Sequence, residues 1–80
     1  MARLPKDVQA ELIGLAMEAE AENYNDYWLL GLVEKAKLFD KRNKPYREQI
    51  FKFLAETDYL TQRLYLELIY FRSRYEEIFT

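Results

Sequence analysis

The last part of the chain, from Tyr46 to Thr80, contains neither glycine nor proline. A stretch of this kind, rich in Leu, Glu and Arg, favours helix. A seam of mostly apolar residues recurs through it at steps of three and four positions, with one extra step of four. The seam consists of Tyr46, Ile50, Phe53, Thr57, Leu60, Leu64, Leu68, Phe71, Tyr75 and Ile78.

One continuous helix over this stretch would be about 52 Å long, which is long for a small domain. The polar residues Glu56, Thr57 and Asp58 offer a cap for a new helix. Because the seam keeps its phase across that point, we favour a single long or kinked helix, with a split near 56–58 into a fourth helix as the alternative.

Two shorter helices are predicted before it. The first runs from Pro5 to Glu22, and its apolar stripe is widened by Ile13 and Met17. The stripe itself consists of Val8, Leu12, Leu15 and Ala19. The second runs from Asp26 to Asp40, capped by Asn25 or Asn23. Its expected core residues are Leu29, Leu32, Val33, Ala36 and Phe39.

The clearest predicted loop runs from Lys41 to Pro45. With 80 residues the chain is expected to form one domain, 1–80. We therefore predict a small all-α bundle of three helices, the last one long or kinked. Residues 64–71 also have a strand-like composition, but no turn signal bounds them and no second strand is available for pairing.

The surplus of apolar residues around 64–71 is the main functional signal. Glu67 is the single polar residue among these eight. If Leu64, Leu68 and Phe71 face the core, a second apolar stripe lies away from it. That stripe consists of Tyr59, Leu66, Ile69 and Tyr70, which we predict to bind another protein. The alternative is that the first two helices cover both sides of this helix.

Charge is unevenly distributed along the chain. Residues 1–34 carry two basic and seven acidic groups, net −5, residues 35–52 carry seven basic and two acidic groups, net +5, and residues 53–80 carry net −2. The basic 35–52 segment contains a possible binding patch for nucleic acid or an acidic partner at Lys41, Arg42, Lys44 and Arg47. A sequence pI of about 5.1 argues against nucleic acid. The acidic first half offers a further hypothesis, imitation of a nucleic-acid surface.

The composition excludes several kinds of chemistry. The chain has no Cys and no His, so it can form no Cys-His or Ser-His-Asp nucleophile and no zinc site built on these residues. We expect no enzyme activity, no cofactor and no metal. The start of the chain lacks the apolar core of a signal peptide, and no run is long enough to span a bilayer. A cytoplasmic location and no membrane partner are expected.

The sequence thus predicts a non-enzymatic protein–protein interaction module, acting as a regulatory, inhibitory or assembly subunit. We expect it to self-associate through its C-terminal helix, with a homodimer favoured. The alternative is a small nucleic-acid-binding helical protein that uses residues 35–52.

Overall fold

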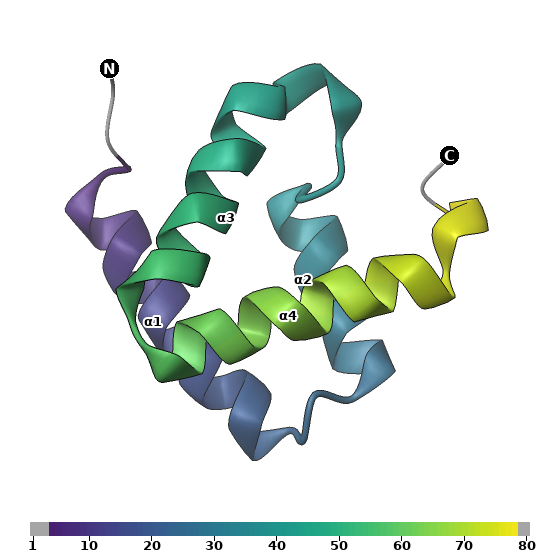
Figure 1. Ribbon diagram of the computed structural model, residues 1–80, viewed down its shortest axis with the longest axis horizontal. Helices are drawn as coiled ribbons and strands as arrows, with labels where there is room; N and C mark the ends of the chain where they lie inside the picture. The colour runs from purple at the N-terminus through teal and green to yellow at the C-terminus, as the bar shows by residue number, and fades with distance from the viewer. Residues whose placement is uncertain (1–3, 79–80) are drawn as a thin grey trace.

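The computed structural model describes residues 4–78, which form helices and short connections. The order is α1 (Lys6–Ala21), α2 (Asp26–Ala36), η1 (Lys41–Asn43), α3 (Lys44–Thr57), α4 (Tyr59–Arg74) and η2 (Glu76–Ile78), where η1 and η2 are 3-10 helices (Figure 1). No strand occurs among the described residues, and 64–71 lie within α4. The all-α prediction is therefore confirmed.

The turn between α1 and α2 is held by backbone hydrogen bonds and one cap. Beyond the end of α1, the Asn23 amide donates to the Glu20 carbonyl (3.0 Å) and the Tyr24 amide to the Ala19 carbonyl (2.9 Å). This pair of hydrogen bonds closes the end of α1 around a residue in the left-handed conformation, Asn23, whose φ is 54°. Asn25 then caps α2, because its Oδ1 accepts from the amide of Tyr27 at 2.8 Å.

The second helix ends earlier than predicted, at Ala36 rather than Asp40. Lys37 adopts a left-handed conformation with φ 52°, which stops the helix, and the Leu38 amide donates to the Val33 carbonyl at 3.3 Å. The reversal turns Leu38 and Phe39 into the core, where they are 2% and 7% exposed. In a continued helix the side chains of Leu38 and Phe39 would point in directions about 100° apart.

The long C-terminal helix that we favoured is not observed, and the alternative break near 56–58 is correct. Asp58 is extended, with φ −156° and ψ −176°, and separates α3 from α4. Its Oδ1 accepts from the Thr61 amide and its own amide donates to Thr61 Oγ1, both at 3.0 Å. This capping box starts a new helix. The break lets α4 fold back against α3, which a continuous rod cannot do (Figure 1).

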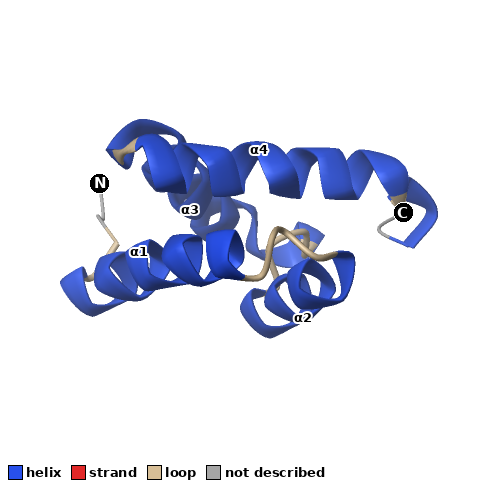
Figure 2. Ribbon diagram, turned by 90° about the horizontal axis from the view of Figure 1, so that it is seen from below, coloured by secondary structure: helices blue, strands red, loops and turns tan. Residues whose placement is uncertain are grey.

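The four helices form a flat particle with extents of 32 × 31 × 18 Å. Figure 2 shows α4 in one layer and α1 and α2 in the other. Four residues of the predicted seam lie in the core, Ile50, Leu64, Leu68 and Phe71, and Phe53 and Leu60 pack against it. Tyr46, Thr57 and Tyr75 are exposed, and the side chain of Ile78 lies outside the described part. The core consists of Leu4, Leu12, Ala16, Ala19, Leu29, Leu32, Val33, Leu38, Phe39, Ile50, Leu54, Leu64, Leu68 and Phe71.

The apolar stripe of α1 is narrower than predicted. Leu12 and Ala19 are buried as expected, but Ile13 is 37% exposed and Met17 is 59% exposed. In a helix, Met17 lies about 140° round the axis from Leu12. Burying both residues would therefore require a second element packed on the other side of α1. Within residues 4–78 the neighbouring helices leave that side of α1 open.

Candidate functional site

Four large apolar side chains lie on the side of α4 that faces away from the core. Tyr59 is 74% exposed, Tyr70 57%, Leu66 43% and Ile69 37%. Leu66 lies about 160° round the helix from the fully buried Leu68, since successive residues are about 100° apart. We call these four residues the α4 outer face. Their own chain leaves them uncovered, and their role in binding stays a prediction.

The α4 outer face has no charge at its centre. Gln62 and Ser73, both exposed, lie on the same side of the helix. At one edge, Arg63 Nε donates to Glu67 Oε2 at 3.0 Å, and its guanidinium lies 4.7 Å from the centre of the Tyr24 ring. An uncharged aromatic centre with Arg at its margin is typical of a protein-binding surface.

The area of this face indicates which size class of contact it can make. Two exposed tyrosines with Leu66 and Ile69 expose on the order of 400–500 Å². The largest apolar patch on a typical monomer is of similar size and is often functional. A standard protein–protein interface covers about 800 Å² of each partner. The α4 outer face alone therefore matches a weak or transient contact.

The predicted basic patch forms one corner of the molecule, and much of its charge is already engaged. The patch residues Lys41, Arg42, Lys44 and Arg47 lie in η1 and the start of α3. Arg42 donates from Nε and Nη2 to the two carboxylate oxygens of Asp40 (3.2 and 3.1 Å). This guanidinium holds the pKa of Asp40 below its ordinary value.

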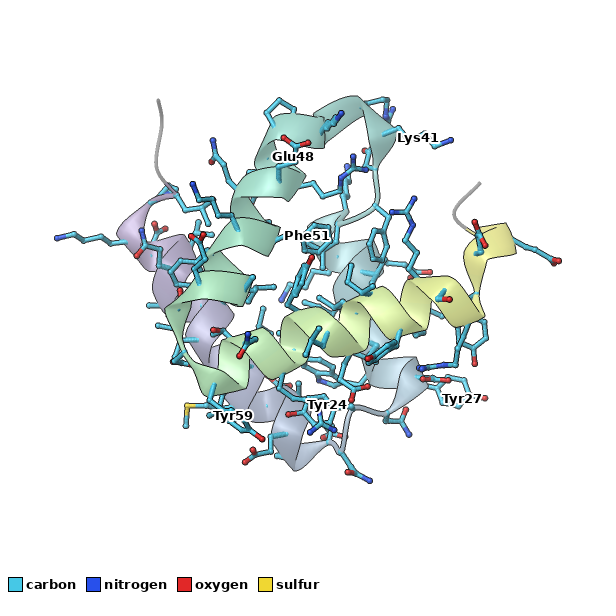
Figure 3. The ribbon with its side chains drawn as sticks, viewed as in Figure 1. Tyr24, Tyr27, Lys41, Glu48, Phe51 and Tyr59 are labelled. Carbon is cyan, nitrogen blue, oxygen red and sulfur yellow. The ribbon has the colours of Figure 1, made fainter. Side chains whose placement is uncertain are left out.

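The other members of the patch differ in whether they contact a partner within the chain. Arg47 Nη1 donates to the Asp40 carbonyl at 3.3 Å, and Lys44 Nζ lies 3.8 Å from Glu48 Oε1. Lys41 projects from the corner into solvent, whereas Glu48 lies back on α3 (Figure 3). Internal partners reduce the charge that this corner can offer to a phosphate backbone.

A charged cluster that the sequence did not reveal joins the start of α2 to the end of α4. Arg74 Nη2 donates to Asp26 Oδ1 at 2.6 Å, and the Tyr75 hydroxyl donates to Oδ2 at 2.7 Å. These residues are 48 and 49 positions apart. The Tyr75 hydroxyl and then the Arg74 guanidinium stabilise the carboxylate, which lowers the pKa of Asp26. Tertiary folding alone brings them together, so no local pattern could have indicated the cluster.

This cluster should make the folding stability of the protein depend on pH. Because the native pKa of Asp26 is lowered, its contribution is fully present above the unfolded-state pKa and is lost as pH falls through the native one. We expect Tyr75→Phe to raise the pKa of Asp26 toward its ordinary value. A carboxyl NMR titration from about pH 7 to about pH 2 measures it. An unchanged Asp26 titration in the variant would contradict the assignment.

A second exposed apolar surface lies on α1 and was missed because Ile13 and Met17 were assigned to the core. On the same exposed side of the helix lie three small residues. We call the set the α1 outer face: Ala10, Ile13, Gly14, Met17 and Ala21. A helical-wheel comparison with Leu12 and Ala16 could have found it, since these five positions fall opposite or beside that buried pair.

Two classes of site find no support in the described part of the chain. Residues 4–78 contain no group of three or more acidic, His or Cys side chains placed to hold a metal ion. None of the helices described in that range combines the length and the apolar character needed to cross a bilayer.

The chain matches no protein-family model, and no curated protein or solved structure gives a significant match to it. The functional argument therefore depends on the surfaces described above.

Proposed function

We propose that this protein is a non-enzymatic protein–protein interaction module, a regulatory, inhibitory or assembly subunit, that self-associates through the α4 outer face. The observation that carries the proposal is the exposure of Leu66 at the middle of that face, directly opposite the buried side of α4. Covering Tyr59, Leu66, Ile69 and Tyr70 removes apolar area from water, at about 25 cal/mol per Å² before the costs of association.

The tyrosines support the same assignment. Tyr59 and Tyr70 are large and have few rotatable bonds, so they lose little conformational entropy when a partner covers them. Their hydroxyls can keep hydrogen bonds at the rim of a contact. A dimer is the smallest product of such self-association, and its weak interface places the transition in the micromolar range or above.

The double variant Leu66→Arg/Tyr70→Glu tests the proposal. It replaces two exposed side chains without changing the net charge, so the fold should persist while the apolar face is lost. We expect association to weaken by at least about tenfold, because each desolvated anchor contributes more than about 1 kcal/mol. Sedimentation velocity with circular dichroism measures both association and folding.

The matched control is Lys52→Glu/Glu56→Arg, which makes the same spacing of charged substitutions on the exposed polar side of α3. This variant should associate as the unmodified chain does. A folded Leu66→Arg/Tyr70→Glu variant with undiminished association, or an equal loss in the control, would refute the role of the α4 outer face.

Nucleic-acid binding by residues 35–52 is the second candidate. It is favoured by Lys41, which projects into solvent (Figure 3), and by Tyr46 in the same basic segment, which is 37% exposed. A labelled DNA or RNA whose binding falls steeply with salt and is lost in Lys41→Glu would support this candidate. No shift at physiological ionic strength would exclude it.

A further inference from the structure

The outward side of α4 has the residue spacing of a contact between two helices. Five exposed residues recur along it at steps of three, four, three and four, and we call them the α4 stripe: Tyr59, Gln62, Leu66, Ile69 and Ser73. This is the heptad spacing with which one helix packs along another. Leu66 lies at the midpoint, seven residues from Tyr59 and seven from Ser73. The stripe is about 21 Å long.

The α4 stripe contains no charged residue, so two copies of it can meet without like-charge repulsion. The nearest charge, Arg63, lies about 60° from Leu66 round the helix and is paired with Glu67 at 3.0 Å. Arg74 is held at 2.6 Å by a carboxylate of α2. Arg72 lies about 120° from Leu66, away from the stripe. The centre of the face is therefore compatible with an identical, uncharged surface.

An antiparallel pair of α4 helices from two copies sets large side chains against small ones. With a two-fold axis at Leu66, residues at equal distances on either side of it face each other. Tyr59 then faces the partner's Ser73, and Gln62 faces the partner's Tyr70. A parallel pair would instead crowd two tyrosines at one end and leave two serines at the other. The antiparallel pair also brings helix ends of opposite partial charge together.

The Arg63–Glu67 ion pair adds complementary charge at one edge of the antiparallel contact. The two-fold axis brings this edge of one copy against the same edge of the other. Arg63 then differs in height along the helix by about 3 Å from the partner's Glu67, but by about 9 Å from the partner's Arg63. Each guanidinium can therefore share a carboxylate of the second copy.

We propose that the α4 outer face binds the same face of a second copy of this chain, as an antiparallel pair with Leu66 at the two-fold axis. This inference rests on the proposed function and specifies its partner. Two such faces together cover on the order of 800–1,000 Å², which lies in the size class of weak complexes. Because each copy uses its α4 outer face in the one contact, assembly stops at twice the monomer mass of 9.7 kDa.

Cross-linking through introduced cysteines tests this pair, because the chain has no cysteine of its own. A disulfide requires Cα atoms within about 7 Å of each other. In an oxidised equimolar mixture of Tyr59→Cys and Ser73→Cys, disulfides should join one variant to the other. Neither variant should cross-link to itself, since its two cysteines lie about 21 Å apart along the helix axis. Lys52→Cys, exposed on α3, measures cross-linking by random collision.

The other outcomes separate this inference from the proposed function. Self-cross-linking of Ser73→Cys would show a parallel pair, and a mass that rises beyond the dimer would show head-to-tail association. Either result overturns the inference and leaves the role of the α4 outer face intact. A mixed disulfide no more abundant than that of Lys52→Cys also overturns it. An unmodified chain that stays monomeric refutes both proposals.

A distance measurement gives the same answer without removing Tyr59. A nitroxide label on Ser73→Cys keeps all four residues of the α4 outer face. In the antiparallel pair the two labels should lie on the order of 20 Å or more apart. In a parallel pair they would be separated only by the distance between the helix axes, about 10 Å. Electron paramagnetic resonance of the dimer distinguishes the two, and a separation near 10 Å would contradict the antiparallel pair.

Discussion

Leu68→Ala should destabilise the fold by about 3 kcal/mol and lower Tm by about 12–25 °C. Leu68 is fully buried on the inner side of α4, where that helix packs on α1 and α3. Removing its branched side chain loses burial and leaves a cavity that the surrounding helices fill only in part. A small domain has a net stability of about 5–15 kcal/mol, so the loss is a large share of the total. Urea unfolding followed by circular dichroism measures the change.

Leu66→Ala is the matched control, because it makes the same substitution two residues earlier on the same helix. Leu66 is 43% exposed, so its truncation should cost less than about 1 kcal/mol in the monomer. The same change should weaken self-association, which Leu68→Ala affects only through folding. Equal destabilisation by the two substitutions would show that Leu66 is enclosed and would remove the basis of the proposed function.

Asp58→Ala should lower stability by about 1–2 kcal/mol and lower Tm by about 5–15 °C. The Asp58 carboxylate accepts from the Thr61 amide, and the variant leaves that first-turn donor of α4 without its side-chain acceptor. It also removes the N-cap residue that separates α3 from α4. Thermal unfolding by circular dichroism measures the effect.

Glu56→Ala provides the comparison for Asp58. Glu56 is exposed in the last turn of α3, so its loss should change stability by no more than about 0.5 kcal/mol. If Asp58→Ala has an effect as small as Glu56→Ala, the cap is not what stabilises the break. If Asp58→Ala raises stability, the account of the α3–α4 corner is wrong.

Local patterns in the sequence predict most of the helices but not where the last two meet. The spacing of Leu64, Leu68 and Phe71 correctly predicts the buried side of α4, and of the two predicted cap candidates, Asn25 and Asn23, the structure uses Asn25. The apolar seam keeps its phase through Asp58, so periodicity alone favours continuity. The capping box of Asp58 and Thr61 starts α4 as a new helix, and α4 then packs on α3, a tertiary contact that periodicity does not show.

The sequence also predicts only part of the exposed apolar surfaces. The exposed positions of Leu66 and Tyr70 follow from simple helix geometry, since more apolar residues surround α4 than the core can cover. The exposure of Met17 does not, because the sequence does not reveal which side of α1 its neighbours cover. The left-handed Lys37 is a further example, because Lys carries none of the preference for this conformation that Gly or Asn has.

Sedimentation equilibrium over a concentration series tests the central claim most directly, with the unmodified chain and Leu66→Arg/Tyr70→Glu measured in parallel. We predict that the unmodified chain rises above its monomer mass of 9.7 kDa as concentration increases from about 5 µM to about 500 µM, while the folded variant stays at the monomer mass. A constant monomer mass for the unmodified chain, or the same rise in both proteins, would contradict self-association through the α4 outer face.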